Sequence, residues 1–141
     1  MAIPELHLAY VDGACSGNPG PMGIGGVIYS PDGRVLFELS DSKGPGTNNQ
    51  AEYLALIAVL EAARRHGVSA IEIRSDSELL VRQVNGIYKV KHEGIRPLYE
   101  QATRLLGLFD DYRVVHIRRE QNKEADRLSK AGLEKTAVSG A

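Results

Sequence analysis

The sequence has a single cysteine, Cys15, among its 141 residues. One cysteine excludes an internal disulfide and any zinc site built from several cysteines. No segment approaches the run of about twenty apolar residues that a membrane span requires. The first residues also lack a basic segment followed by a long apolar stretch, which is the pattern of a secretory signal. We therefore expect a cytoplasmic protein that does not associate with membranes.

A strong excess of either charge is missing too, because 17 Lys and Arg residues nearly balance 18 Asp and Glu residues, for a net charge of -1. The chain thus has no overall positive field to attract a polyanion, although a local basic patch would suffice. Hydrophobic residues make up 43% of the sequence and charged residues 25%, as in ordinary soluble globular proteins. A chain of this length can form one domain with its own core.

Hydrophobic patterns divide the chain into five strands and four helices. A three-residue turn at 31–33 predicts an antiparallel hairpin, whereas helices between the later strands predict parallel crossovers. The order βββαβααβα therefore predicts an α/β fold, a mixed sheet flanked by helices. We expect one domain over residues 1–135 and a small polar tail over 136–141 that frays. The expected strands are 7–13, 23–30, 34–40, 70–76 and 112–120, and the expected helices are 48–67, 77–86, 97–108 and 122–135.

Four acidic residues stand at expected strand ends or in the first turns of expected helices. In α/β sheets, such positions come together at one edge of the sheet. Carboxylates crowded in one place raise the pKa of at least one of them unless cations neutralise the charge. Two hard cations with oxygen ligands are typical of phosphoryl-transfer chemistry, so the joint arrangement predicts a metal centre. The four acids are Asp12, Glu52, Asp76 and Asp126.

Asp12 has two interpretations of equal weight. It continues the face of Leu6, Leu8 and Tyr10 on the first strand, which aims its carboxylate toward the packed side of the sheet or its rim. A buried charge without a partner costs several kcal/mol, so such a residue must be paired, protonated or bound to a cation. Alternatively, the strand ends at Val11 and Asp12 only opens a turn.

The other three acids have structural explanations that prevail when each is taken alone. Glu52 is spaced to complete a capping box with Asn49 as the N-cap, and Asp76 is placed to cap the helix that follows it. Asp126 falls in the first turn of the last helix, where a negative charge complements the helix dipole. Only the four acids together predict a metal centre.

Four segments resemble the type 1 ribonuclease H family, in matching order and spacing over about residues 6–133. The family's five-stranded mixed sheet agrees with the expected order of elements. One such segment would be a weak signal, whereas four in register are highly specific. They are DGACSGNPGP at Asp12–Pro21, TNNQAEYLAL at Thr47–Leu56, SDSELLVRQVNG at Ser75–Gly86 and REQNKEADRLS at Arg119–Ser129.

The resemblance implies an endoribonuclease that hydrolyses the RNA strand of RNA–DNA hybrids with two Mg²⁺ ions, for which Mn²⁺ is expected to substitute. It implies that Asp12 contacts both ions, that Asp126 completes the shell of one, and that Glu52 and Asp76 complete the other. Attack of water in line on the phosphorus would then leave 5′-phosphate and 3′-hydroxyl ends. Asp12 should be the least replaceable of the four.

The resemblance also implies contacts to the hybrid. Thr47 matches a hydroxyl residue that contacts a DNA phosphate, and Asn85 is expected to assist it. Helix capping by residues 47–49 is the alternative, and it is compatible with binding because a helix N-terminus attracts phosphate. The positions expected near the minor groove, where the 2′-hydroxyl distinguishes RNA from DNA, are Gly17, Asn18, Asn48 and Asn49.

Two departures from the family pattern stand out. Many relatives place a histidine on a flexible loop after the last strand, and nothing here matches it; Arg119 is the nearest candidate and Arg118 the second. An arginine is not a general base at neutral pH, so it would act on phosphate charge or on product release. Basic ends on an exposed strand are an equally good explanation.

The second departure is a basic protrusion that some relatives carry after the second helix. Here it is reduced to residues 86–94, with Lys89, Lys91 and His92. Solvated loop charges are the ordinary explanation for so modest a patch. We therefore predict weaker hybrid affinity than in relatives with the full protrusion.

Two other functions suit the same fold. A non-catalytic module that binds hybrids or double-stranded RNA would have degraded acidic positions, whereas all four are intact here. Another nuclease of the wider fold, integrase-like or proofreading, would differ in its acidic motifs and in the contacts of Asn18 and residues 47–49. We expect a monomer whose partner is an RNA–DNA hybrid.

Overall fold

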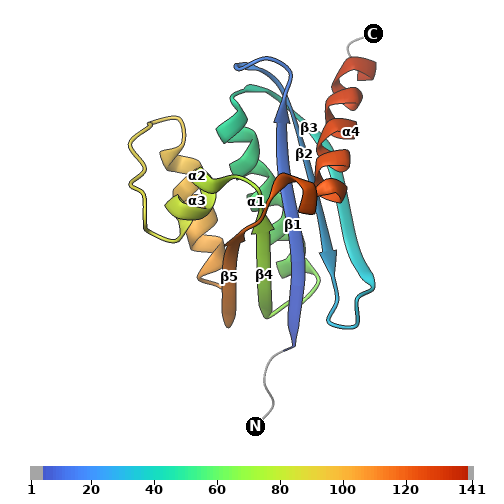
Figure 1. Ribbon diagram of the computed structural model, residues 1–141, viewed down its shortest axis with the longest axis vertical. Coiled ribbons are helices and arrows are strands. Elements are labelled where there is room, and N and C mark those ends of the chain that lie inside the picture. The colour runs from blue at the N-terminus through green and yellow to red at the C-terminus, as the bar shows by residue number, and fades with distance from the viewer. Residues whose placement is uncertain (1–4, 140–141) are drawn as a thin grey trace.

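The computed structural model describes residues 5–139, which form a five-stranded mixed sheet with helices on its two faces (Figure 1). The element order is the expected one, with an additional 3₁₀ helix before the last α-helix. Within these residues, every helix is too short or too polar to serve as a membrane span. In chain order the elements are β1 (Leu6–Cys15), β2 (Gly20–Tyr29), β3 (Val35–Gly46), α1 (Asn48–Arg65), β4 (Ala70–Ser75), α2 (Glu78–Val84), α3 (Arg96–Leu106), β5 (Asp111–His116), η1 (Arg119–Gln121) and α4 (Lys123–Ser139).

The sheet has the strand order β3-β2-β1-β4-β5, so β1 is its central strand. β2 pairs antiparallel with β1 and β3, whereas β4 pairs parallel with β1 and β5. This confirms the mixed sheet that the hairpin turn and the crossovers predict. The pairing of β1 with β4 ends at Val11 and Ser75, so Asp12 is the first residue of β1 beyond its β4 neighbour.

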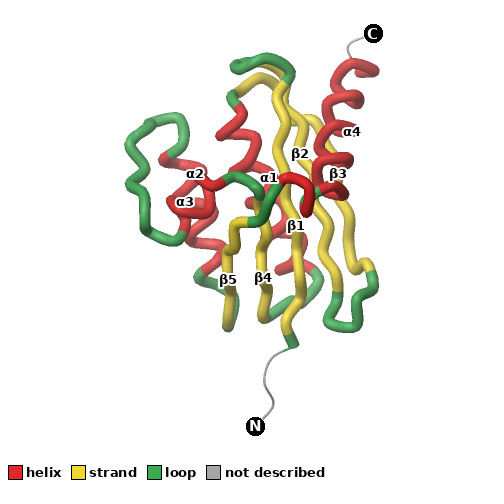
Figure 2. Tube along the Cα trace, viewed as in Figure 1, coloured by secondary structure: helices red, strands yellow, loops and turns green. Residues whose placement is uncertain are grey.

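Two neighbouring glycines of β2 show how closely the helices approach the sheet. A β-carbon on Gly26 would collide with Val59 of α1, whereas one on Gly25 would collide with the backbone of α4 at Ser129. Successive residues of a strand point to opposite faces, so α1 and α4 lie on opposite sides of the sheet. Helix α4 packs on β1, β2 and β3, and Figure 2 shows it in front of the sheet with α1 behind.

Helix α1 forms the centre of the hydrophobic core on its side of the sheet. Leu56, Val59 and Leu60 are completely buried, as the nearly continuous apolar sequence of this segment predicts. They belong to one cluster with Ile71 and Ile73 of β4. Burial of one such side chain stabilises the fold by about 1.5–3 kcal/mol. This core fixes the position of the first turns of α1 against β1.

The last strand is shorter than predicted. β5 ends at His116 rather than continuing to Glu120, and residues 119–121 form η1 instead. The N–H of Ile117 donates to the carbonyl of Ser75, where the neighbouring strand β4 ends. Without a strand to pair with, the chain leaves the sheet and crosses over β4 and β1 toward α4 (Figure 1).

The last helix is longer than predicted, because α4 reaches Ser139 rather than residue 135. The tail expected over residues 136–141 therefore begins within this helix. Residues 140–141 lie outside the described part of the chain, and fraying of the end stays a prediction. Helix α3 differs from its expected range of 97–108 by only one residue at its start and two at its end.

Candidate active site

Asp12 lies near the carboxyl end of the central strand, and only 7% of it is exposed. β1 continues through Cys15, so the interpretation in which Asp12 opens a turn after Val11 is wrong. Ala9 and Val11 face the core around α1, whereas Asp12 is on the opposite face with the half-buried Tyr10. Helix α4 covers that face at this end. The expected position at the packed side or its rim is thus correct.

Two side chains hold the Asp12 carboxyl group. Its Oδ2 accepts a hydrogen bond of 2.6 Å from the Ser129 hydroxyl of α4, and the carboxyl group also shares a hydrogen bond with Glu52. Burial raises the pKa of Asp12 to about 7, although the Ser129 hydroxyl opposes the rise. The negative charges of Asp76 and Asp126 raise this pKa further. Acidic neighbours thus dominate the electrostatic environment of Asp12.

Glu52 does not cap α1. The N-cap is Thr47, whose hydroxyl accepts from the Gln50 N–H at 3.2 Å while the Gln50 side chain accepts from the Thr47 N–H at 2.9 Å. The predicted capping box of Asn49 and Glu52 is therefore wrong. Glu52 is 8% exposed, and its Oε1 accepts a hydrogen bond from the backbone N–H of Gly13 on β1.

Gly13 makes this contact possible because β1 and α1 approach each other so closely there. A β-carbon on Gly13 would overlap the backbone of Ala51 and Glu52. Burial is the main reason that the pKa of Glu52 lies well above its ordinary value, and the neighbouring Asp12 raises it further. The Gly13 N–H acts in the opposite direction, since it favours the ionised carboxylate.

Asp76 follows β4, but it does not cap α2 either. Ser77 is the N-cap, and its hydroxyl accepts from the Leu80 N–H at 3.2 Å. Asp76 Oδ2 instead accepts a hydrogen bond of 3.2 Å from Nδ2 of Asn122, a buried residue directly before α4. The same Nδ2 donates to the carbonyl of Val11 at 2.9 Å. Capping is therefore the wrong explanation for Asp76, which is tied to the end of β1.

Asp12, Glu52 and Asp76 form what we call the carboxylate cluster, with one oxygen atom from each within 4.8 Å of the others. None of the described ion pairs involves any of these three acids. Asn122 Oδ1 beside them is buried without a hydrogen-bond partner among the described residues. Carboxylates this close either hold protons or bind a cation, and hard divalent ions prefer oxygen ligands. The residues therefore fit a divalent metal centre.

Asp126 lies beside the carboxylate cluster rather than in it. It belongs to the first turn of α4 and forms an ion pair of 2.9 Å with Lys130, one turn later. Together with Asp12, Asn48 and Arg119, these two residues line one recess. The helix-dipole explanation suits Asp126 as well, so both interpretations are compatible with its position. The structure thus brings three of the four acids to one point and places the fourth next to Asp12.

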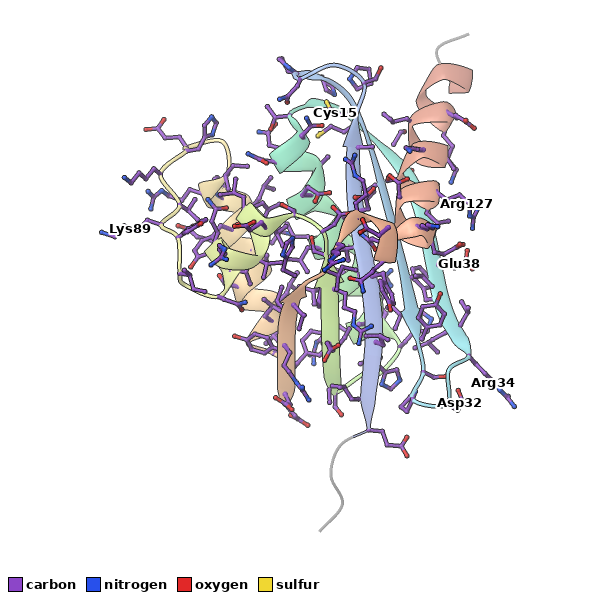
Figure 3. All side chains as sticks on the ribbon, viewed as in Figure 1. Cys15, Asp32, Arg34, Glu38, Lys89 and Arg127 are labelled. Carbon is purple, nitrogen blue, oxygen red and sulfur yellow. The ribbon has the colours of Figure 1, made fainter. Side chains whose placement is uncertain are left out.

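The two candidate arginines take different positions. Arg119 on η1 lines this recess, as does Cys15 at the end of β1, which is labelled in Figure 3. Arg118 precedes η1, and its N–H donates to the Gln121 side chain at 3.0 Å. Of the two arginines, Arg119 is thus the one at this recess, which Lys130 also lines. Neither arginine lies in β5, so their interpretation as basic ends of a strand is wrong.

A second groove gathers most of the residues that the resemblance assigns to the substrate. Asn18 Oδ1 accepts from the Asn48 N–H at 3.0 Å, which joins the turn after β1 to the start of α1. Gly17 precedes Asn18 in that turn with a φ of 90°. Asn85 is not among the lining residues; its Nδ2 donates to the Val114 carbonyl at 3.0 Å and ties α2 to β5. The groove is lined by Asn18, Thr47, Asn48, Asn49, Leu79, Gln83, His92 and Ile95.

Sequence reasoning missed Asn122, Ser129 and Lys130 of the site. All three belong to the segment around Asp126. Residues three and four positions apart share one face of a helix, so the spacing of Ser129 and Lys130 after Asp126 was a usable signal. No pattern in the sequence indicates that Asn122 reaches across to Val11.

The strand order and the buried carboxylates define a protein of the ribonuclease H-like class. A family model described as "Reverse transcriptase-like" matches residues 10–132. Ribonuclease HI of Halobacterium salinarum is 44% identical over 126 residues, which are 89% of this chain and 63% of that protein. Ribonuclease H of a Jannaschia species is 32% identical in an alignment of 148 positions, which covers 93% of this chain and 92% of that protein.

Solved structures show the same similarity to ribonucleases H. RNase H1 of Halobacterium salinarum matches with a TM-score of 0.89 at 43% identity, over 92% of this chain and 98% of that chain. LC11-RNase H1, solved in complex with an RNA/DNA hybrid, matches with a TM-score of 0.87 at 39% identity, over 93% and 99%. The chain belongs to the type 1 ribonuclease H family. It spans less than two thirds of the Halobacterium enzyme and 36% of a bifunctional protein of Mycobacterium tuberculosis.

Proposed function

We propose that this protein is a metal-dependent endoribonuclease that cuts the RNA strand of RNA–DNA hybrids. The observation that carries the proposal is the carboxylate cluster at the end of the central strand of a ribonuclease H fold. Relatives named ribonuclease H support it, as does the hybrid bound to LC11-RNase H1. The intact acids speak against a module that only binds.

Mg²⁺ is the proposed cofactor, two ions to a site, and Mn²⁺ is expected to replace it. Asp12, Glu52 and Asp76 would hold one ion, and Asp12 with Asp126 the other. When bound, the ions supply positive charge at the scissile phosphate and lower the pKa of the attacking water.

The protein's own contribution is to hold these carboxylates in place before a substrate arrives. Ser129 and Asn122 donate hydrogen bonds to two of them. Arg119 and Lys130, in the same recess, supply positive charge for phosphate oxygens. An arginine holds its proton at neutral pH, so Arg119 would act on phosphate charge or on product release. We expect products with 5′-phosphate and 3′-hydroxyl ends.

The groove at the start of α1 is the proposed reader of the hybrid. Amide side chains of Asn18, Asn48 and Asn49 both donate and accept hydrogen bonds, which suits a 2′-hydroxyl and the base edges of a minor groove. Thr47 caps the helix here, and the positive end of the helix dipole favours a phosphate at the same place. Capping and binding therefore act together. Asn85 lies apart from this groove, so its expected role at the phosphate is the least supported.

Incubation of labelled hybrid, duplex RNA and duplex DNA of one sequence, with and without Mg²⁺, tests the proposal. We expect cleavage of the RNA strand of the hybrid only when metal is present. Asp76→Asn should lose at least about 100-fold in activity and still bind the hybrid. Asp110→Asn, at an exposed acid before β5, is the matched control and should keep full activity. Full activity of Asp76→Asn would contradict the assignment, and binding without cleavage by the unaltered protein would indicate the non-catalytic module.

We also propose that the protein acts as a monomer in the cytoplasm. The acids of the proposed site all come from one chain, so a second copy is not needed to complete it. Light scattering after size exclusion should give the mass of one chain, with and without hybrid. A stable dimer whose disruption abolishes cleavage would overturn the monomer proposal.

A further inference from the structure

Ser129 is a buried polar residue in contact with the carboxylate cluster. It lies on α4 and is completely buried. Its hydroxyl oxygen is 2.6 Å from Asp12 Oδ2 and 2.9 Å from the backbone carbonyl of Asp126. One hydroxyl group therefore contacts the central acid of the cluster and the helix turn that carries the fourth acid.

The hydroxyl has one proton and two acceptors within reach. A hydrogen bond to an ionised carboxylate is shorter and roughly twice as strong as one to a neutral carbonyl. The shorter of the two distances is the one to Asp12 Oδ2. The carbonyl of Asp126, in contrast, is inside a helix, where the N–H four residues later bonds to it. The proton of Ser129 is thus best placed on Asp12.

Close packing holds the backbone of Ser129 in place. A β-carbon on Gly25 would collide with the backbone N of Ser129, and one on Gly23 with its carbonyl oxygen. The backbone of α4 therefore rests directly on β2, the strand that pairs with β1 at Asp12. The packing of α4 on β2 thus fixes the backbone of Ser129 beside Asp12.

We propose that Ser129 is a positioning residue, which fixes the orientation of Asp12 and so sets the affinity of the site for divalent metal. The inference rests on the proposed function, because it takes Asp12 as the ligand common to both ions. With Oδ2 oriented by the hydroxyl, the carboxylate meets the ions in one arrangement. Without that bond, the Asp12 carboxylate would be free to rotate out of the arrangement that holds the ions.

The matched control comes from a second serine that contacts the same helix. The hydroxyl of Ser40 on β3 donates to the carbonyl of Leu128 at 2.6 Å, one residue before Ser129. Ser40→Ala removes a hydrogen bond to α4 without altering any contact of Asp12. A role of Ser129 in holding α4 alone would make Ser129→Ala and Ser40→Ala behave alike.

Calorimetric titration of Mn²⁺ into the full chain measures the effect without any turnover. We expect Ser129→Ala to bind Mn²⁺ about tenfold more weakly than the unaltered protein, at the low end of the range for groups that orient metal ligands. Ser40→Ala should bind as the unaltered protein does. Ser129→Cys, which keeps a weak donor of similar size, should fall between them and serves if the alanine variant folds poorly.

Cleavage of hybrid at several Mn²⁺ concentrations gives a second readout. The lower activity of Ser129→Ala should recover when Mn²⁺ is raised about tenfold, with an unchanged KM for hybrid. Equal Mn²⁺ affinity of Ser129→Ala and Ser40→Ala would overturn the inference, as would an activity loss that metal does not restore. If the unaltered protein itself binds no Mn²⁺, the proposed function has failed instead.

Discussion

The backbone N–H of Gly13 donates a hydrogen bond to the carboxylate of Glu52, and this bond joins the central strand to the first helix. Glu52 thus has a fixed place beside Asp12, the residue that precedes Gly13. The bond favours the ionised form of Glu52, although burial outweighs it and keeps the pKa of Glu52 well above its ordinary value. The contact requires a residue without a side chain at position 13.

Gly13→Ala should therefore destabilise the protein and displace Glu52. The added β-carbon overlaps the backbone of Ala51, which neither element can avoid without moving. We expect a loss of roughly 3 kcal/mol in the free energy of unfolding, the upper range for overpacking, measured by urea denaturation. Gly107→Ala is the control, since that glycine has an ordinary helical φ of -65° and its added β-carbon would be 3.5 Å from its nearest neighbour. A loss under about 1 kcal/mol for Gly13→Ala would show that the two elements separate easily.

The metal-free protein should become less stable as the pH rises. The folded-state pKa of Asp12 is raised from 3.8 to about 7, so its stabilising contribution is complete below pH 3.8 and is lost as the pH passes through 7. Glu52 is shifted in the same direction. Between pH 5 and pH 8 we expect the protein to lose about 2 kcal/mol of unfolding free energy relative to Asp12→Asn.

Urea denaturation of both proteins at several pH values, in the presence of a chelator, measures this difference. Saturating Mg²⁺ should abolish the loss at pH 8, because a bound cation neutralises the same carboxylates. Parallel pH profiles for the protein and Asp12→Asn would contradict the raised pKa.

Asn122→Ala should weaken the fold and the site together. The substitution leaves the carbonyl of Val11 without its donor and removes the hydrogen bond to Asp76. Loss of a partner for a buried polar group costs about 1–3 kcal/mol, which unfolding experiments can measure. Asn85→Ala is the control. It also removes a hydrogen bond from a side-chain amide to a strand carbonyl, that of Val114, but at a place away from the acids. Only Asn122→Ala should also lower the affinity for Mn²⁺, and equal affinities in the two variants would show that Asn122 is purely structural.

The loop over residues 86–94 should contribute little to hybrid binding. Its Lys89 points outward into solvent, away from the helices (Figure 3). The double variant Lys89→Ala, Lys91→Ala should change the slope of log K against log salt by less than about 0.9, the value for one phosphate contact. A larger change would mean that the loop contacts the phosphates of the hybrid. Hybrid affinity equal to that of relatives with a full protrusion, measured at matched salt, would contradict the predicted weaker affinity.

Local sequence patterns predict most of the fold. The five strands, four α-helices and mixed pairing followed from periodicity and from connection lengths. The helix caps were misassigned because Thr47 and Ser77 compete with the neighbouring Asn49 and Asp76, and only the three-dimensional path of the chain decides between them. The end of β5 was missed for a related reason, since a strand stops where its partner stops.

Contacts between residues far apart in the sequence could not be predicted from local patterns. The convergence of the acids followed from strand ends and helix starts, but their separation did not, and Asp126 stands outside the cluster. Hydrogen bonds from Asn122 and Ser129 to residues more than a hundred positions earlier depend on how α4 docks on β2. No local pattern encodes that docking.

The pairing of β1 with β4 ends at Val11. There the side-chain amide of Asn122 donates a hydrogen bond to the Val11 carbonyl, in place of the backbone of a further strand residue. A side chain thus closes the end of the sheet where β1 and β4 separate, and the Val11 carbonyl has its hydrogen bond before a substrate binds. A phosphate or ion would bind between these strand ends without any rearrangement of the backbone. Its association should therefore be fast and should leave amide hydrogen exchange in β1 unaltered.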